Sequence, residues 1–476
     1  MAIERHDLNY SKQVVEIVEQ KEELLTRVSD QIWSFAETRY EEYKSAELLA
    51  SVLEEEGFTV ERNAGGIETA FVASYGEGKP IIAILGEYDA LSDLSQEKGK
   101  PEYTPQVPGG NGHGCGHNLL GTGALGAALA VRTFMERHQI QGTVRYYGCP
   151  AEEGGGGKAY MVRKGLFSDV DTAVTWHPGG LTNIMDVSSL ATSQVFFRFK
   201  GKSAHAGGDA YLGRSALDAV ELTNVGCNYL REHIIPEARI HYAITRTGGV
   251  SPNVVQSDAE VLYKIRTPKS EQLAELYERV CNVAKGAALM TGTELSIQYD
   301  SGSSELIVNR VLEQFLFDKL NELGIPEFSE LEKGFAAEIR STMSEAELRH
   351  IPEELNDEVF TNRIESYKPT EEVKVAMGST DVGDVSWNVP TAQAWIASMA
   401  LGTSLHSWQA VSQFGTSIGH KGMLHASKLL GAAVVGLFEH PEIIEQAKQE
   451  WSGRMKNRRY ECPIPEGFVP QPIIKG

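Results

Sequence analysis

Short apolar runs rich in β-branched residues alternate with helical segments along most of this 476-residue chain. Strands are predicted at 58–62, 69–76, 80–91, 143–149, 171–177 and 391–398, and helices at 14–36, 46–56, 119–134, 158–165, 309–324 and 419–439. Strands that alternate with helices form a mostly parallel sheet covered by helices on both faces. The sequence therefore predicts an α/β domain, although segment 327–372 is charged and only weakly periodic.

A second pattern interrupts the first. The predicted elements there are a strand at 194–201, a helix at 213–233, strands at 239–249 and 260–268, a helix at 270–290 and a strand at 294–300. This βαββαβ order is that of the ferredoxin-like split βαβ sandwich, which is a complete small domain by itself. We therefore expect a discontinuous domain formed by 1–190 and 303–476, with an inserted domain formed by 191–302.

The composition excludes several classes of partner. Hydrophobic residues make up 41% of the chain and charged residues 23%, which is typical of a globular protein. The formal net charge of −21 repels nucleic acid and anionic membranes, so neither is an expected partner. The first 20 residues are charged and do not resemble a signal peptide, and the five cysteines are too scattered for a disulfide framework. We therefore expect a cytoplasmic protein.

Candidate metal ligands follow the ends of several predicted strands. Such ends converge over one crevice in an open parallel sheet, so side chains distant in sequence can meet there. Thiolate, imidazole and carboxylate groups are the usual ligands of divalent ions. The five candidates, enough for two adjacent ions that share a bridge, are Cys115, His117, Glu153, His177 and His406.

Glu152 and Glu153 leave the same strand end in different directions, so one can bind metal while the other acts as a general base. A cysteine nucleophile at Cys115 with a histidine base is a competing interpretation, but it leaves both glutamates without a role. A purely structural zinc site is also disfavoured, because such sites use four ligands in short paired spacings and leave no spare carboxylate.

Eight motifs identify a resemblance to the metal-dependent amidohydrolases that include aminoacylases and the hippurate and auxin-conjugate hydrolases. The motifs occur in the family's order over nearly the whole chain: GEYDAL, GHGCGH, CPAEEGGGGK, TWHPG, GKSAHAG, GGVSPNVV, GSTDVGDVS and LHSWQ. The resemblance implies a zinc-exopeptidase-like catalytic domain, an inserted lid and dimerisation domain, and two Mn²⁺ or Zn²⁺ ions held by the five candidates above.

The resemblance also implies residue roles. Glu152 would be the general base, and His205 and Asn253 would reach a substrate, often across the interface between two chains. Asp89 and Asp381 would be carboxylates that orient ligands. A homodimer, or a heterodimer with a related chain, is the implied assembly.

The implied reaction is hydrolysis of the amide bond of N-acyl or N-aryl amino acids such as aminobenzoyl-glutamate. The substrate carboxylate needs a dedicated cation on an acidic protein, and Arg266 is the first candidate by position, with Arg246 and Arg214 as alternatives. A dipeptidase or aminopeptidase on the same scaffold, and a noncatalytic partner chain that binds acyl amino acids, remain the alternative functions.

Overall fold

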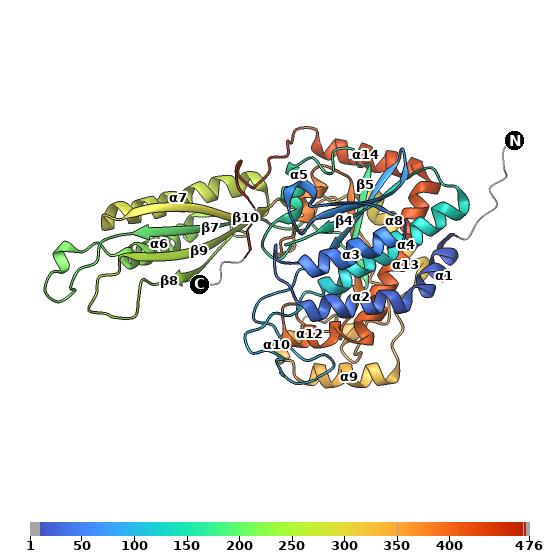
Figure 1. The fold of residues 1–476 in the computed structure, drawn as a ribbon, viewed down its shortest axis with the longest axis horizontal. Coiled ribbons are helices and arrows are strands. Elements are labelled where there is room, and N and C mark those ends of the chain that lie inside the picture. Colours follow the sequence, from blue (N-terminus) through green and yellow to red (C-terminus); the bar gives the residue numbers. More distant parts are fainter. Residues whose placement is uncertain (1–9, 350, 470, 473–476) are drawn as a thin grey trace.

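The computed structural model describes residues 10–349, 351–469 and 471–472. The start of the chain, where we expect no signal peptide, lies outside the described residues as far as residue 9. Two sheets organise the rest, and the second projects from one side of the first (Figure 1). Among the described residues, no helix combines the length and the apolar character that crossing a bilayer requires.

The first sheet has seven strands in the order β1-β2-β4-β3-β5-β11-β6. Their bounds are β1 (Thr59–Arg62), β2 (Phe71–Glu77), β3 (Ile81–Glu87), β4 (Gly142–Cys149), β5 (Thr172–Gly179), β6 (Asn183–Ile184) and β11 (Thr391–Ala397). The four central strands, from β4 to β11, run parallel, whereas β1, β2 and β6 are antiparallel to their neighbours. The predicted mostly parallel sheet is thereby confirmed.

Helices cover both faces of this sheet. On the central strand β3, Ile82 and Ile84 face one core while Ala83 and Leu85 face another, and all four are fully buried. The first core also takes residues of α1 (Tyr10–Gln20), α2 (Glu22–Phe35), α3 (Tyr43–Glu55), α4 (His117–His138), α8 (Arg310–Leu323), α13 (Ser417–Glu439) and α14 (Pro441–Met455). The second takes residues of α5 (Gly157–Arg163) and α11 (Val382–Ser386). Burial on both faces explains why β3 is an uninterrupted apolar run.

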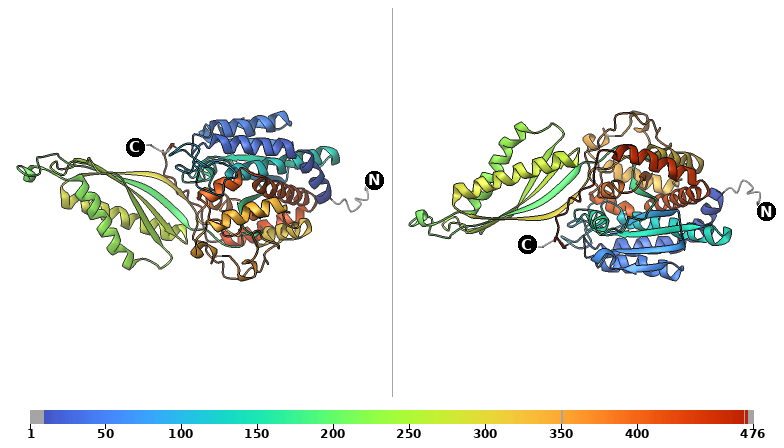
Figure 2. Two further views of the ribbon diagram at one scale, coloured as in Figure 1. Left: turned by 90° about the horizontal axis from the view of Figure 1, so that it is seen from below. Right: turned by 90° about the horizontal axis from the view of Figure 1, so that it is seen from above.

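The second sheet has the order β10-β7-β9-β8, and all its neighbours are antiparallel. Its elements are β7 (Ala191–Lys200), α6 (Ala216–Leu230), β8 (Arg239–Arg246), β9 (Asp258–Thr267), α7 (Ser270–Thr291) and β10 (Glu294–Ser303). Both helices pack on one face of the sheet over a core of its own (Figure 2). This is the βαββαβ order expected from the sequence; its role as a lid and dimer contact stays a prediction.

The boundaries differ from the prediction in three places. The run 14–36 is two helices separated at Lys21, because apolar residues on both sides of that turn pack into the same core and preserve the periodicity. A further helix, α14, follows the predicted last one. The weakly periodic segment contains α9 (Glu330–Ser341) and α10 (Glu345–Leu348), both of which begin with a serine capping box. The remaining helix is α12 (Trp408–Phe414).

The fully buried Leu129 on α4 provides a test of the first core. We expect Leu129→Ala to lower the free energy of unfolding by about 2–5 kcal/mol, since it removes apolar contacts and leaves a cavity between packed helices. The matched control is Leu331→Ala on α9, whose side chain is 89% exposed. Urea unfolding followed by circular dichroism compares the two, and equal midpoints would contradict the assignment of Leu129 to the core.

Candidate active site

The carboxyl ends of the parallel strands place the candidate ligands together. Glu87 ends β3, Glu152 and Glu153 follow β4, and His177 lies near the end of β5. Helix α4 begins at His117, directly after Gly116, which has a positive φ of 76°. A Cβ atom at Gly116 would lie 2.7 Å from Pro178 Cγ, so only glycine allows this close approach of the loop to β5.

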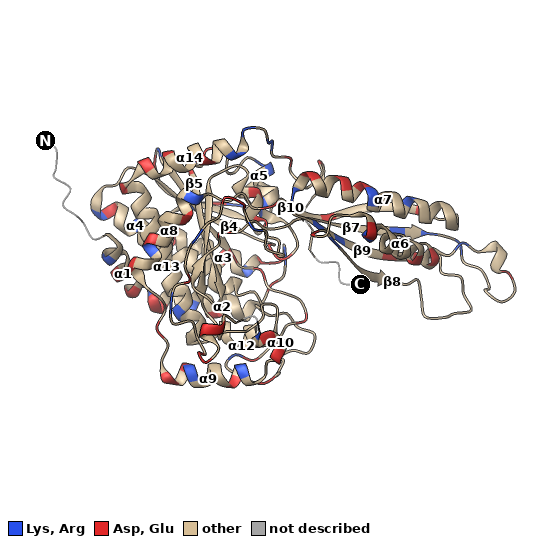
Figure 3. Ribbon diagram, turned by 180° about the vertical axis from the view of Figure 1, so that it is seen from behind, with Lys and Arg blue, Asp and Glu red and all other residues tan. Residues whose placement is uncertain are grey.

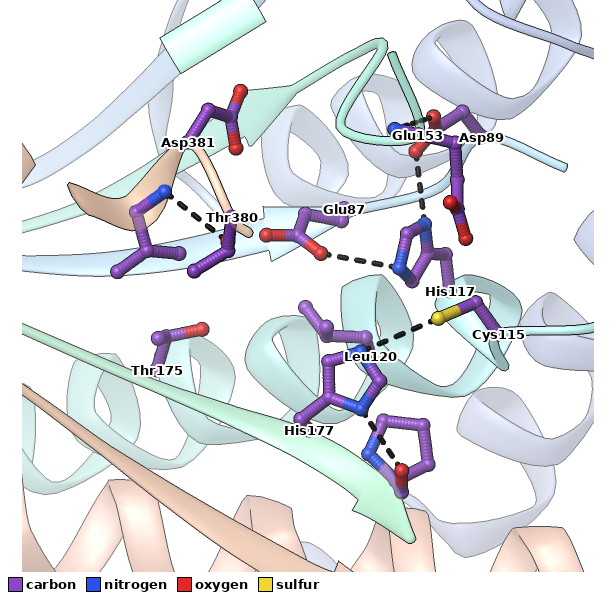
Figure 4. Close-up of polar contacts among 12 residues, drawn as sticks. Glu87, Asp89, Cys115, His117, Leu120, Glu153, Thr175, His177, Thr380 and Asp381 are labelled. Atoms are coloured by element: carbon purple, nitrogen blue, oxygen red, sulfur yellow. Dashed lines mark hydrogen bonds and ion pairs between the residues drawn. The ribbon is translucent and has the colours of Figure 1, made fainter. Parts of the chain in front are cut away.

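Cys115, His117 and His177 form one possible set of metal ligands. One ligand atom from each lies within 4.8 Å of the others, and Cys115 Sγ is 3.5 Å from His177 Nε2 (Figure 4). The His177 ring is held by a 2.8 Å hydrogen bond between Nδ1 and the carbonyl oxygen of Pro178. This bond leaves Nε2 directed at the thiol. Burial lowers the pKa of His177 to about 4, so its imidazole is neutral at neutral pH, as a metal ligand must be.

Cys115, Glu153 and His406 form a second set by the same criterion. His406 Nε2 lies 3.1 Å from Glu153 Oε1, and its backbone N–H donates to the carbonyl oxygen of Gly114. Burial raises the pKa of Glu153, but His406 and His117 outweigh burial and lower it below its ordinary value. All five predicted ligands therefore belong to two sets that share Cys115.

The chemistry of these atoms fits divalent ions. His117 Nε2 and Glu153 Oε1 are buried, and among the described residues neither makes a hydrogen bond of good geometry. Each has one close polar neighbour, Glu87 at 3.3 Å from His117 Nε2 and His406 at 3.1 Å from Glu153 Oε1, so both atoms have free capacity to bind an ion. Each belongs to one of the two sets. A centre for two ions requires nitrogen, oxygen or sulfur ligand atoms that lie close together and can bind zinc or manganese. The two sets provide such atoms.

Asp89 fixes the positions of two candidate ligands at once. Its Oδ1 lies 2.9 Å from His117 Nδ1, which leaves Nε2 for a metal, and its Oδ2 accepts a 2.9 Å hydrogen bond from the backbone N–H of Glu153 (Figure 4). Asp89 itself is 1% exposed. A buried carboxylate that holds a ligating histidine in one tautomer is a common partner of metal sites.

Glu152 lies beside these sets without belonging to either. Burial raises the pKa of Glu152 well above its ordinary value, and the negative charges of Glu87 and Glu153 raise it further. Glu152 Oε, Glu87 and His117 approach within 4.8 Å of one another. A carboxyl group in this environment accepts and retains a proton more readily than an exposed one.

Asp381 hydrogen-bonds to Lys158, and its expected role in orienting a ligand stays a prediction. It accepts hydrogen bonds from the backbone N–H of Lys158 at 2.8 Å and from Lys158 Nζ at 2.6 Å. Lys158 Nζ also lies 2.6 Å from Glu87, and Glu87 lies 3.3 Å from His117 Nε2. Lys158 thus lies between the carboxylates of Glu87 and Asp381, which together compensate the charge of its fully buried ammonium group.

Sequence reasoning missed Glu87, for which a usable signal was present, and Lys158, for which there was none. Glu87 ends the same apolar strand that precedes the glycine loop, and Lys158 ends the glycine run of the CPAEEGGGGK motif. The rule that functional groups follow strand ends covers Glu87 directly. No comparable rule predicts Lys158, because its burial becomes apparent only when helix α5 has been placed against the sheet.

A cavity of about 490 Å³ adjoins the ligands. Residues of the first sheet line it together with residues of β9 and β10, among them Arg266, Lys264 and Trp395. Arg266 donates to Ser379 Oγ at 2.8 Å. The two alternative arginines lie elsewhere: Arg246 pairs with Asp258 at 2.8 Å, and Arg214 donates to backbone carbonyls of its own loop.

His205 and Asn253 are not brought to the cavity within this chain. Neither belongs to the described residues that line it. The two loops that carry them contact each other, because the Ala206 N–H donates to the Asn253 carbonyl. Within its own loop, His205 Nδ1 accepts from the backbone N–H groups of Gly207 and Gly208. Both loops lie at the end of the second sheet that points away from the first (Figure 1).

The chain matches the family model described as Peptidase family M20/M25/M40 over residues 83–410. It is 48% identical over 476 residues to one of the two chains of the p-aminobenzoyl-glutamate hydrolase of Escherichia coli K12, a match that covers 96% of this chain and 98% of that protein. A homologue of the other chain of this hydrolase, from Haemophilus influenzae, is 30% identical over 232 residues, which covers 46% of this chain and 54% of the relative. Relatives thus include both kinds of hydrolase chain.

A solved structure has a similar fold. It is that of a dinuclear metal-binding peptidase of the M20 family from Bacillus subtilis, with a TM-score of 0.55 and 17% sequence identity. The superposition covers 88% of this chain and 99% of that one.

The double contact of Asp89 predicts the effect of removing its charge. We expect Asp89→Asn to weaken metal binding about 10- to 100-fold, the usual cost of losing a carboxylate that orients a ligating histidine. The control is Asp93→Asn, an exposed aspartate four residues away. Competition with a chromophoric chelator measures both affinities, and an unchanged affinity in Asp89→Asn would show that His117 does not depend on this contact.

Proposed function

This chain belongs to peptidase family M20/M25/M40 and is a metal-dependent hydrolase, and on that premise we propose that it cleaves the amide bond of N-acyl or N-aryl amino acids such as aminobenzoyl-glutamate. The observation that carries the proposal is the convergence of two ligand sets beside Glu152, an unligated carboxyl group. The relative that is 48% identical belongs to a p-aminobenzoyl-glutamate hydrolase, which supports the choice of substrate.

We propose that Cys115, His117, Glu153, His177 and His406 hold two divalent ions. Ions held by these residues would supply a more acidic water at neutral pH and positive charge near the amide oxygen. The thiolate of Cys115 favours zinc, whereas the carboxylate and imidazoles also accept manganese. The five cysteines are free thiols, which supports a reducing compartment such as the cytoplasm.

Glu152 moves the proton in this proposal. It takes a proton from the attacking water and returns it to the leaving nitrogen, so that one group serves as base and then as acid. Burial and the neighbouring carboxylates raise the pKa of Glu152, which strengthens it as the base that takes the proton of the attacking water and lets it hold that proton until the leaving nitrogen accepts it.

The cavity offers a cation and an aromatic wall to the two ends of an aryl-amide substrate. Arg266 lines the cavity and donates to a serine hydroxyl there, which supports its role in binding the substrate carboxylate. The Trp395 ring lies 4.6 Å from the His177 ring, next to the ligand sets, and can stack with an aryl group.

We propose that His205 and Asn253 act from a second chain, either another copy of this protein or a related chain of the other kind. The exposed position of both residues far along the second sheet, and the edge strand β8, support this arrangement. His205 would then assist the developing oxyanion of a neighbouring active site.

The role of Glu152 predicts that Glu152→Gln keeps its metal while its rate falls about 10²- to 10⁴-fold, the usual contribution of general acid–base catalysis. The assay follows release of aminobenzoate by the purified chain, with elemental analysis alongside and exposed Glu345→Gln as the control. Faster cleavage of dipeptides than of acyl amino acids would favour the peptidase alternative, and a wild-type chain that binds without cleaving would favour the noncatalytic alternative.

The proposed action of His205 on a neighbouring chain predicts complementation between inactive variants. Equal mixing of Glu152→Gln and His205→Ala homodimers, with exchange of chains, forms heterodimers that contain one site with both groups intact. We expect recovery of about a quarter of wild-type activity, since half of the dimers then carry one of two sites. No recovery after demonstrated exchange would mean that His205 acts within its own chain or not at all.

A further inference from the structure

Lys264 is a cation in the cavity without an anionic partner among the described residues. It lies on β9, half-buried, among the residues that line the cavity beside the ligand sets. In the part of the chain that the structure describes, no hydrogen bond or ion pair joins its ammonium group to another side chain. Burial lowers the pKa of Lys264 and the positive charge of Arg266 lowers it further, and together they outweigh the charges of Glu152, Glu153 and Asp300, which raise it. An anion bound directly to the ammonium group would therefore stabilise it further.

Three carboxylates, Glu152, Glu153 and Asp300, act on Lys264 through their charge; Asp300 and Glu153 are engaged by other groups, and Glu152 forms no ion pair with Lys264 among the described residues. Asp300 accepts hydrogen bonds from both terminal nitrogens of the Arg39 guanidinium, at 3.0 and 2.8 Å, and from Gln194 Nε2 at 2.6 Å. Glu153 pairs with His406. Lys264 is therefore available to bind a ligand that enters the cavity.

Lys264 and Arg266 form a pair on one face of β9. Side chains two residues apart on a strand point to the same side, with Cα atoms about 6.5 Å apart. Both side chains line the cavity, and the guanidinium contacts only Ser379 Oγ among the described side chains. Acidic residues are spread over the helices of both units of this acidic protein, so two adjacent unpaired cations are a local exception (Figure 3).

We propose that Lys264 binds the side-chain carboxylate of the amino-acid half of the substrate while Arg266 binds its α-carboxylate, so that the site selects acyl derivatives of dicarboxylic amino acids. The inference rests on the proposed function and deepens it. The two carboxylates of glutamate are separated by three carbon atoms, a span that a flexible lysine and an arginine from neighbouring same-face positions can bind together. A monocarboxylate would leave one buried cation unpaired, which is costly.

The experiment compares substrates that differ only in that side-chain carboxylate. For aminobenzoyl-glutamate and aminobenzoyl-glutamine, kcat/KM is measured with the wild type, Lys264→Met, Lys264→Arg and the control Lys200→Met. Lys200 is an exposed lysine at the end of β7, so its replacement makes the same change in net charge outside the cavity lining.

We expect Lys264→Met to lose about 10- to 100-fold in kcat/KM on the glutamate substrate and little on the glutamine substrate, the usual effect of losing a charge-assisted hydrogen bond. Lys264→Arg retains most of the preference, and Lys200→Met leaves both rates unchanged. An equal loss on both substrates would overturn the inference, since it would indicate a general effect of Lys264 on Glu152 or on folding. Unchanged selectivity would overturn it as well.

A binding measurement separates this inference from the proposed reaction. Isothermal titration of the metal-loaded chain with N-acetylglutamate and N-acetylglutamine, with and without Lys264→Met, tests the carboxylate preference without turnover. A preference for the glutamate ligand that disappears in Lys264→Met supports the inference even if aminobenzoyl-glutamate is not cleaved, a result that would overturn the proposed substrate alone. Equal binding of both ligands by the wild type would overturn the inference while leaving the amidohydrolase proposal intact.

Discussion

Asp89 is the contact on which the arrangement of the candidate site depends. It follows the central strand β3, and its two carboxylate oxygens contact the first residue of α4 and the loop after β4. Three separate parts of the chain are thereby fixed by one buried group. His117 and Glu153 belong to different ligand sets, so the position of one set relative to the other also depends on Asp89. Its place at the end of β3, within the helix-covered sheet, makes that position rigid.

The sequence was sufficient for the sheet and for the grouping of the candidate ligands, because the first follows from periodicity and the second from the ends of the strands. Alternating strands and helices imply a parallel sheet, and the carboxyl ends of parallel strands converge, so Cys115, Glu153 and His177 were predictable as neighbours. The contacts of Lys158 with Asp381 and Glu87 were not predictable, because a buried ion network depends on which helix covers which strand end. Helix boundaries failed at Lys21, where two helices share one core and the turn leaves no gap in the apolar pattern.

The inserted sheet contributes to the site at one end only. The end near the first sheet supplies Arg266 and Lys264 to the cavity, whereas the far end carries His205 and Asn253 away from it. A single rigid sheet cannot bring both ends to the same cavity. Residues at the far end therefore either act in the site of a neighbouring chain or have no part in the reaction. This conclusion depends on the length of the antiparallel strands and not on a sequence motif.

Charge accounts for the position of the proposed substrate-binding residues, Lys264 and Arg266, on the inserted sheet. The first sheet gathers Glu87, Glu152 and Glu153 around the ligand sets, and these carboxylates repel an anionic substrate when no cation is present. Cations placed among them would form ion pairs, as Lys158 does with Glu87 and Asp381, and would then be unavailable to a ligand. Strand β9 belongs to a separately packed unit, so its lysine and arginine can face the cavity without being neutralised by the network beneath it. The separation of anionic and cationic groups between two sheets is the arrangement that the proposed binding of metal cations and of a carboxylate substrate in one cavity requires.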